Sequence, residues 1–494
     1  MSLITLSNIT FAYDGTYDNV FENFSVQLDT DWRLGLIGRN GRGKTTLLRL
    51  LMGELEARGR ISAPVGLRYF PVPVRDPSVP ARLAAAEAGG FEPWELSREL
   101  GLLGLSEELL ERPFGTLSGG EQTRLMLAAL FAGEAVYPLI DEPTNHLDRE
   151  GRERVAAYLR RKDGFLLVSH DRALLDGCID HVLSLNRAGA ALQRGNFTDW
   201  QREKERRDAS EQAENEKLRR EISRLDAAAR QASVWSDRTE STKYATKNSG
   251  LRPDRGYIGH KSAKMMQRSK SIQSRRENAA AEKSKLLHNI ETAEPLKLWP
   301  LRHPKSVLAE ARGLSACYGD KTVFRDVRFV LRRGDRLAVT GGNGCGKTTL
   351  LRLFGGGAVD YAGSLSLAPN LKISVVPQMT DFLRGGLDAF IRERAVDGTL
   401  FRAILRKLDF PRVQFEKPME QYSAGQRKKV LLAASLCDRA HLYIWDEPLN
   451  YIDVFSRMQL EELLLTYQPT LLFVEHDAAF CGKIATGMLP LPPG

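Results

Sequence analysis

The sequence predicts an α/β protein in which two copies of one domain are joined by an α-helical hairpin. Three observations lead to this fold class. Four short motifs recur in the same order in the first and last thirds of the chain. Around these motifs, short apolar segments alternate with helical segments, as in domains built on buried parallel strands. Between the two copies lies a charged stretch with almost no strand signals, from about Trp200 to Ala293.

The repeat is visible in the spacing of the motifs. GRNGRGKTT begins at Gly38 and GGNGCGKTT at Gly341, an offset of 303 (341 − 38). LSGGEQ and YSAGQR place serines at Ser118 and Ser423, an offset of 305, and the later IDEPTNHLD and VSHD motifs recur at 305 and 306. Because four motifs keep one order at nearly constant spacing, we interpret the chain as a duplication of one domain. The predicted boundaries are 1–199 for the first domain, 200–304 for the linker and 305–494 for the second domain.

Each copy contains a glycine-rich loop that fits the pattern GxxxxGK[ST] and lies between an apolar strand segment and a helical segment. In such a loop the glycines let backbone N–H groups surround phosphate oxygens, and the lysine reaches the β- and γ-phosphates. The two loops therefore predict two ATP sites. Their predicted nucleotide contacts are Gly38, Asn40, Gly41, Gly43, Lys44, Thr45 and Thr46 in the first copy, and Gly341, Asn343, Gly344, Gly346, Lys347, Thr348 and Thr349 in the second.

An aspartate ends an apolar strand segment in each copy. These residues, Asp141 and Asp446, are expected to organise Mg²⁺ and its water, together with the hydroxyls of Thr45 and Thr348. A carboxylate and a threonine hydroxyl are oxygen donors, which this ion prefers. The sequence therefore predicts one Mg²⁺ site in each copy.

Two further pairs of residues are candidates for the chemistry itself. Glu142 and Glu447 directly follow the strand-ending aspartates, where a second carboxylate is suited to orienting or deprotonating the attacking water. His170 and His476 follow apolar strands, where an imidazole is placed to hydrogen-bond the γ-phosphate. We predict that all four act in hydrolysis.

Composition indicates the compartment and the class of partner. The net charge is +9 with a pI near 9.2, which hints at an anionic partner. Five scattered cysteines without a CxxC pair suit a reducing cytosol. The sequence has no apolar run near the roughly 20 residues of a membrane helix, and its start lacks signal-peptide features. We expect a cytoplasmic protein, for which any membrane role requires separate membrane subunits.

LSGGEQ and YSAGQR resemble the signature sequence of ABC ATPases. The same family also has the DEP motifs, the histidines that follow strands, and D-loop aspartates, which Asp148 and Asp453 resemble here. The resemblance implies that the two domains pack head to tail with two ATP molecules between them. One composite site would join the first phosphate loop to Ser423, Ala424 and Gly425; the other would join the second loop to Ser118, Gly119 and Gly120.

Other features of the family are placed by the same resemblance. Tyr13 and Tyr318 resemble its adenine-stacking aromatic, although they would stack on guanine too, so GTP stays an alternative. Gln378 resembles the Q-loop glutamine, which contributes to ATP and Mg²⁺ binding, but the first copy has Val72 at this position. The second signature also has Ala424 in place of glycine. Both departures fall on the site that uses Lys44, and we therefore predict that this site is the slower one.

The linker has the pattern of two antiparallel helices. In the first, Leu218, Ile222, Leu225 and Ala229 recur at i, i+4, i+7 and i+11, a narrow apolar seam. The helical pattern is interrupted at the tip, near 236–262, where basic residues predominate and aromatic residues lie among them. Such side chains suit phosphate and nucleobases. In the second helix the seam is Ala279, Leu286, Leu287 and Ile290; the predicted RNA-binding residues are Lys243, Tyr244, Lys247, Arg252, Arg255, Tyr257, Ile258, Lys261 and Lys264.

A duplicated chain with this linker resembles the ABC-F family, and the WDEPLNYID motif and DRGYIGHKSAKMMQRSK tip resemble its antibiotic-resistance branch, of the Lsa-like type. The resemblance implies a monomer, with its two domains paired within one chain, that enters the E site of the 70S ribosome. There the linker would reach toward the peptidyl-transferase centre of 23S rRNA, shift the P-site tRNA and displace lincosamides, streptogramin A and pleuromutilins. Two alternatives stay open: the ATPase subunit of an ABC exporter, and a housekeeping translation factor.

Overall fold

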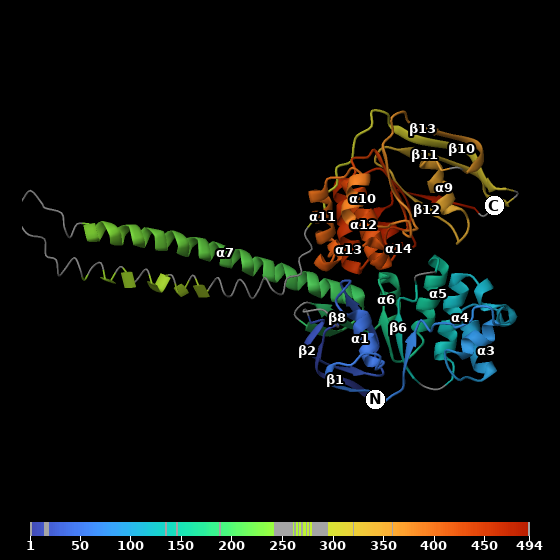
Figure 1. Ribbon diagram of the computed structural model, residues 1–494, viewed down its shortest axis with the longest axis horizontal. Helices are drawn as coiled ribbons and strands as arrows, with labels where there is room; N and C mark the ends of the chain where they lie inside the picture. The colour runs from blue at the N-terminus through green and yellow to red at the C-terminus, as the bar shows by residue number, and fades with distance from the viewer. Residues whose placement is uncertain are drawn as a thin grey trace, which may run out of the picture. The chain divides into compact units, whose positions relative to one another are not determined.

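The computed structural model describes residues 2–13, 19–133, 136–144, 147–186, 189–241, 295–319, 321–357 and 359–492, and some residues between 260 and 278. The chain divides into two compact units (Figure 1). One consists of Met1–Trp200 and Ala293–Gly494 and contains both copies of the duplicated domain. The other, Gln201–Thr292, belongs to the linker.

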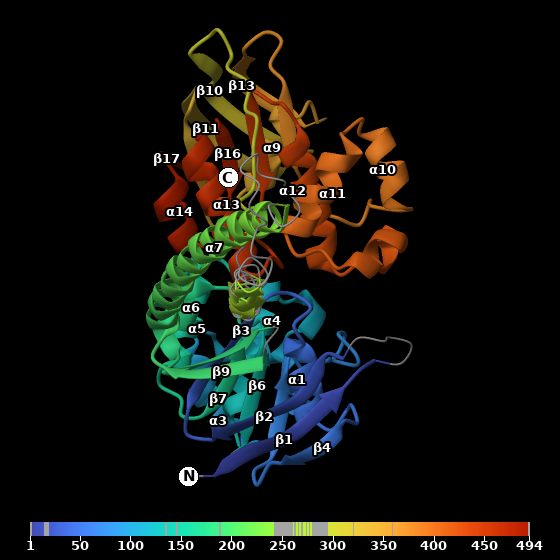
Figure 2. The same cartoon turned by 90° about the vertical axis from the view of Figure 1, so that its left-hand side faces the viewer.

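The first copy is built on a six-stranded sheet with the order β5-β6-β7-β3-β8-β9. Its strands are parallel except for β9, which pairs antiparallel with β8. The central strands are buried almost throughout, which explains why they form apolar runs without alternation. A separate antiparallel sheet has the order β2-β1-β4 (Figure 2). The strands are β1 Leu3–Phe11, β2 Phe21–Asp29, β3 Arg33–Gly38, β4 Arg58–Ser62, β5 Leu67–Phe70, β6 Tyr137–Asp141, β7 Phe165–Val168, β8 His181–Asn186 and β9 Gly189–Arg194.

Several helices of the first copy begin at motif residues. Ser118 forms a capping box with Glu121, and Asp148 and Asp171 each accept a hydrogen bond from a backbone N–H three residues on. The motifs therefore also define where these helices start. The helices are α1 Lys44–Leu51, α2 Ala81–Ala86, α3 Pro93–Leu102, α4 Gly119–Phe131, α5 Arg149–Leu159 and α6 Arg172–Cys178, with short 3-10 turns at Glu107–Glu111 and Phe114–Thr116.

The second copy repeats this arrangement. A parallel sheet has the order β14-β15-β16-β12-β17, and an antiparallel sheet has the order β11-β10-β13. The predicted α/β class with two tandem domains is thereby confirmed. The strands are β10 Val307–Tyr318, β11 Lys321–Arg332, β12 Arg336–Thr340, β13 Asp360–Leu367, β14 Ile373–Val376, β15 Leu442–Asp446, β16 Leu471–Val474 and β17 Gly487–Pro490. The helices are α9 Lys347–Phe354, α10 Leu387–Glu393, α11 Gly398–Lys407, α12 Ala424–Cys437, α13 Val454–Tyr467 and α14 Ala478–Ile484, with 3-10 turns at Arg412–Glu416 and Met419–Gln421.

The linker begins as one long helix, α7, Phe197–Ser241. Its first turn is anchored because Phe197 and Trp200 are buried in the core of the first copy. Along the predicted seam Leu218, Ile222 and Leu225 are half-buried. The described residues between 260 and 278 are helical, as the prediction of a second helix requires. Its seam residues, and the side chain of Ala229, lie outside the described part of the chain.

Candidate ATP sites

The functional residues gather at the ends of adjacent parallel strands. Gly38 ends β3 and Asp141 ends β6, and His170 lies two residues beyond the end of β7. Because β6, β7 and β3 are parallel neighbours, their carboxyl ends meet at one edge of the sheet, where ligands of open α/β sheets bind. The second copy places Thr340, Asp446 and His476 in the same way.

The phosphate loop of the first copy wraps around the side chain of its lysine. Lys44 Nζ donates to the carbonyl of Gly38 at 2.7 Å and to that of Arg39 at 3.2 Å. Gly43 has a φ of 87°, and a Cβ there would lie 2.7 Å from Val20, so glycine is required. In the second loop Lys347 Nζ donates to the carbonyl of Gly341 at 2.9 Å and to that of Gly342 at 2.8 Å. Both loops therefore have the geometry that the motif predicts.

One cavity of about 590 Å³ joins the first phosphate loop to the second signature sequence. Asn40 of the loop donates to the carbonyl of Tyr451 at 3.2 Å, which fixes the loop against the second copy. Tyr13 also lies at this cavity, with its hydroxyl 2.9 Å from Thr46 Oγ1. The predicted site residues that line the cavity are Tyr13, Asn40, Gly41, Gly43, Lys44, Thr45, Thr46, Asp141, Glu142, His170, Ser423, Ala424 and Gly425.

The second phosphate loop opens onto a different cavity, of about 510 Å³. Lys347 and His476 line it, and the first copy contributes Asp148 of its D-loop. Among the described residues, its lining does not include the predicted signature partners Ser118, Gly119 and Gly120. It does not include Tyr318 either, which is 47% exposed. The structure thus brings together the first composite site but not the signature half of the second.

Both candidate catalytic glutamates have the left-handed backbone conformation, with φ of 51° at Glu142 and 46° at Glu447. Such strain in a residue other than glycine is typical of functional sites. His170 Nε2 lies 3.4 Å from Glu142, and His476 Nε2 lies 3.7 Å from Glu447. Each predicted acid and histidine therefore lie side by side.

The two glutamates differ in electrostatics. Burial, with neighbouring Asp141, raises the pKa of Glu142 to about 8. Burial also holds the pKa of His170 well below its usual value, so this imidazole is neutral. Burial would likewise raise the pKa of Glu447, but hydrogen bonds from His476 and Gln378 lower it below its ordinary value. Glu447 is therefore the carboxylate that is ionised at neutral pH.

The predicted metal ligands lie in position to act together. Thr45 Oγ1 donates to Asp141 at 3.3 Å, and Thr348 Oγ1 donates to Gln378 at 3.5 Å. Burial raises the pKa of Asp141, and it raises the pKa of Asp446 to about 6. Within the described chain, Asp446 Oδ1 is buried without a hydrogen-bond partner. A buried oxygen of this kind is a suitable ligand for a hard cation.

One residue at the first site was missed by the sequence analysis. Tyr69, on β5, donates its hydroxyl to Asp141 Oδ2 at 3.1 Å and lines the first cavity. Val72, the counterpart of Gln378, packs against the core instead. The available signal was that the first copy has Tyr69 where the second, 306 residues on, has Val375.

Comparisons with known proteins agree with this geometry. The family model described as "ABC transporter" matches residues 21–145 and 324–450, about half of the chain. The chain is 29% identical over 505 aligned residues to the ribosome protection protein VmlR of Bacillus subtilis, covering 99% of this chain and 86% of that protein. It is 30% identical to the ATP-binding protein Uup of Caulobacter vibrioides, over 96% of this chain and 74% of Uup.

The chain is an ABC-F ATPase. The fold is also similar to that of one chain in a solved structure, a complex of archaeal ribosomal stalk protein aP1 and archaeal ribosome recycling factor aABCE1. The TM-score is 0.63 at 19% identity, and the match covers 99% of this chain and 88% of that one. The family model and the likeness to VmlR confirm the predicted membership of the ABC family and the predicted ATPase activity.

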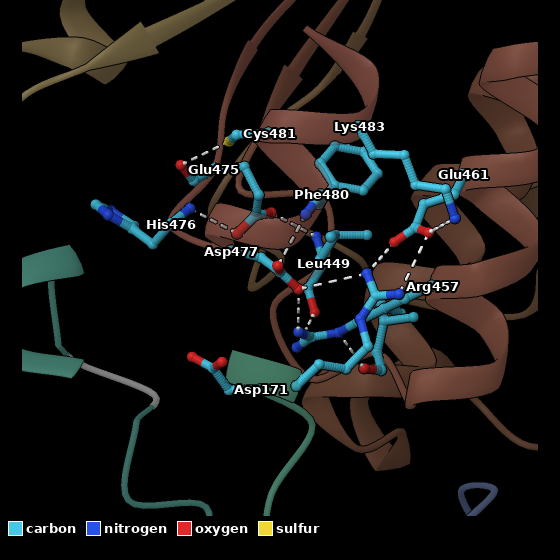
Figure 3. Close-up of polar contacts among 12 residues, drawn as sticks. Asp171, Leu449, Arg457, Glu461, Glu475, His476, Asp477, Phe480, Cys481 and Lys483 are labelled. Carbon is cyan, nitrogen blue, oxygen red and sulfur yellow. Dashed lines mark hydrogen bonds and ion pairs between the residues drawn. The ribbon is translucent and has the colours of Figure 1, made fainter. Parts of the chain in front are cut away.

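In this ABC-F ATPase, one arginine in each copy connects the D-loop to the histidine segment; Arg457 is buried and Arg152 nearly so. Arg152 pairs with Asp171 at 3.0 Å. Arg457 pairs with Asp477 at 3.3 Å, as Figure 3 shows. Arg172 adds a bridge between the two copies: its guanidinium contacts Glu461, which is 1% exposed and also pairs with Lys483 at 3.0 Å. Sequence analysis missed this network, although Arg152 and Arg457 are separated by the repeat offset of 305.

Of the predicted RNA-binding residues of this ABC-F ATPase, the structure describes Lys264, which is helical and exposed. The other tip residues of the prediction lie outside the described residues. They are Lys243, Tyr244, Lys247, Arg252, Arg255, Tyr257, Ile258 and Lys261.

Proposed function

We propose that this ABC-F ATPase is an ATP-dependent ribosome-binding protein of the antibiotic-resistance branch. The observation that carries the proposal is its likeness to VmlR, a ribosome protection protein, over 99% of the chain. That coverage includes the linker as well as both ATPase copies. The likeness also supports a cytoplasmic location and the 70S ribosome as partner. Contacts between the two copies, such as Asn40 to Tyr451, support a monomer with intramolecular pairing of its domains.

ATP and Mg²⁺ are the cofactors that the residues of both sites fit. The phosphate loops and their lysines would hold the phosphates, and Mg²⁺ would be held by Thr45 and Asp141 in the first site. In the second site Thr348, Gln378 and Asp446 would hold it, and the unpartnered Asp446 Oδ1 supports this assignment. When bound, Mg²⁺ neutralises charge on the β- and γ-phosphates.

In the proposed mechanism, ATP completes the contacts between each phosphate loop and the opposite signature, and thereby favours the closed form that binds the ribosomal E site. The linker then reaches toward the peptidyl-transferase centre, shifts the P-site tRNA and displaces lincosamides, streptogramin A or pleuromutilins. Glu142 and Glu447 act on the attacking water, with His170 and His476 beside them. Hydrolysis removes the γ-phosphate contacts and permits release.

The first experiment traps the ATP-bound form. The double variant Glu142→Gln/Glu447→Gln should cosediment with 70S ribosomes when ATP is present and remain unbound without it. A matched control is Glu107→Gln/Glu416→Gln, because both glutamates are exposed on 3-10 turns of the two copies. If the trapped variant sediments no better than the control, the ribosome-binding proposal is wrong.

A second experiment separates ribosome protection from the two alternatives. Deleting residues 236–260 should abolish drug protection in cells and spare basal ATPase activity. None of the described helices is both long and apolar enough to cross a membrane. An exporter subunit would instead copurify with membrane proteins and lower drug accumulation. A housekeeping factor would bind ribosomes but leave drug susceptibility unchanged when the intact chain is expressed.

A further inference from the structure

The two ATP sites stabilise their acidic residues with different side chains. In the second copy Gln378, two residues after the end of β14, accepts from Thr348 and hydrogen-bonds Glu447. In the first copy the equivalent residue is Val72, whose side chain faces the core. The polar side chain is instead Tyr69, three positions earlier and within β5. Its equivalent in the second copy, Val375, has no polar atom to offer.

The position of Tyr69 is determined by the sheet. β5 pairs in parallel with β6, with Phe70 opposite Ile140, so the end of β5 lies beside Asp141. The ring of Tyr69 packs against the apolar cluster under the antiparallel sheet, and its hydroxyl reaches Asp141 Oδ2 at 3.1 Å. That same carboxylate oxygen accepts from Thr45 at 3.3 Å. Tyr69 therefore holds the orientation of the carboxylate that faces the phosphate loop.

The hydroxyl of Tyr69 acts as a hydrogen-bond donor. A phenol hydroxyl is protonated at neutral pH, so at 3.1 Å from Asp141 Oδ2 it can donate to the carboxylate. A protonated phenol that donates to one oxygen of a carboxylate fixes its rotamer and leaves the remaining lone pairs for another ligand. Partners of metal-binding carboxylates that act in this way commonly alter metal affinity or activity by about 10- to 100-fold.

We propose that Tyr69 is the positioning residue that replaces the missing Q-loop glutamine at the first ATP site, where it orients Asp141 toward nucleotide-bound Mg²⁺. The inference rests on the proposed assignment of Asp141 as a Mg²⁺ ligand. It accounts for a first site that keeps its catalytic residues while lacking a glutamine.

The test uses the full-length chain and Mn²⁺ as the probe for the divalent cation. Titration by electron paramagnetic resonance, with a non-hydrolysable ATP analogue present, should reveal two Mn²⁺ sites in the wild type. Tyr69→Phe should weaken one site about 10-fold or more and leave the other unchanged. In a Glu447→Gln background, where turnover reports the first site, Tyr69→Phe should lower ATP hydrolysis by a similar factor.

The chain offers a matched control. Tyr137 lies on the neighbouring strand β6, and within the described chain its buried hydroxyl has no hydrogen-bond partner. Tyr137→Phe thus removes the same atom from the same sheet, and it should leave both readouts unchanged. If Tyr69→Phe matches Tyr137→Phe in Mn²⁺ affinity and in turnover, the inference is overturned.

Rescue by a glutamine gives an independent readout. Val72→Gln should restore Mn²⁺ affinity in the Tyr69→Phe variant. In the wild type it should raise Mn²⁺ affinity by less than about twofold, because Tyr69 already orients Asp141 there. An equal gain in both backgrounds would mean that Tyr69 and the introduced glutamine act separately, which contradicts the inference. A wild type that binds no Mn²⁺ with nucleotide would instead overturn the metal assignment itself, a result distinct from an unaffected Tyr69→Phe variant.

Discussion

The two copies of the ATPase domain share their motifs and backbone but differ in how the same positions are stabilised. In the first copy Asp141 is held by Tyr69, and Glu142 has a pKa near 8. In the second copy Gln378 and His476 lower the pKa of Glu447. A general base must be ionised when water attacks, and at neutral pH Glu447 meets this condition better. We therefore predict that the two sites share one chemistry but hydrolyse ATP at different rates, with the first site the slower one.

The largest expected effect concerns the two catalytic glutamates. Glu447→Gln should lower steady-state phosphate release by about 10²-fold or more, the usual contribution of a general base. Glu142→Gln should leave most of the turnover, because the first site contributes less of it. Glu107→Gln, on an exposed 3-10 turn, serves as the control. If Glu142→Gln is the more damaging substitution, the predicted ranking of the sites is wrong.

The next comparison concerns the helices that follow the signature sequences. Lys429 on α12 is 1% exposed and pairs with the buried Asp453 at 2.9 Å. Lys429→Met leaves that aspartate without its lysine partner, although Ser456 still donates two hydrogen bonds to it. Breaking such a buried ion pair costs about 3–5 kcal/mol of the free energy of unfolding. The equivalent Arg124 is partly exposed and donates to the carbonyl of Leu103 at 3.2 Å, so Arg124→Met should cost less. Urea unfolding of both variants measures the difference; equal costs would show that the second copy does not depend on this pair.

The sequence was sufficient to predict the fold class and the places of the motif residues. Phosphate loops, strand-ending acids and capped signature helices are local patterns, and each implies its own backbone geometry when the expected strand and helix flank it. Asp141 and Asp446 end β6 and β15, and Ser118 and Ser423 cap α4 and α12, as these motifs imply. The roles assigned to these residues stay predictions.

Contacts between distant segments were not predictable in the same way. Tyr69 reaches Asp141 because β5 and β6 are neighbours, and Arg172 reaches Glu461 across 289 residues. Neither pair has a characteristic spacing, because each depends on the packing of elements far apart in the chain. A comparison of the two copies, position by position, would have drawn attention to both pairs. Tyr69 is replaced by Val375 in the second copy, Arg172 by Ala478, and Glu461 by Ala156 in the first copy, and all three counterparts are apolar.

A smaller effect is expected from the bridge between the copies. Arg172 of the first copy contacts Glu461 of the second, whereas the equivalent positions, Ala478 and Ala156, carry no charge. Because Glu461 keeps Lys483 as a partner, Arg172→Met should cost about 1.5–3 kcal/mol, the usual contribution of hydrogen bonds to a charged group. Thermal unfolding of Arg172→Met, Glu461→Gln and the double variant measures the coupling. Additive costs would show that the two side chains do not stabilise each other.

The smallest predicted effect is a dependence of stability on pH that comes from a buried glutamate of the first copy, whose counterpart in the second copy is apolar. Glu99 on α3 is 1% exposed and accepts from Tyr158 at 2.6 Å and from Lys162 at 2.5 Å. Burial opposes ionisation, but these hydrogen bonds lower the pKa of Glu99 below its ordinary value of 4.5. The residues 305 positions further on are apolar or aromatic: Ile404, Leu463 and Tyr467.

A carboxyl group whose pKa is lower in the folded state stabilises the fold above its unfolded pKa, and this stability is lost as pH falls through the folded value. The wild type should therefore lose stability below about pH 4.5 more steeply than Glu99→Gln/Lys162→Met, in which both members of the pair are neutral. Denaturation midpoints measured from about pH 6 to 3 by circular dichroism check this, with Glu107→Gln as the control for an exposed glutamate. Parallel pH profiles for the wild type and the double variant would mean that Glu99 has the same pKa in the folded and unfolded states. Glu99, Tyr158 and Lys162 would then add no more pH dependence to the first copy than their counterparts Ile404, Leu463 and Tyr467 add to the second.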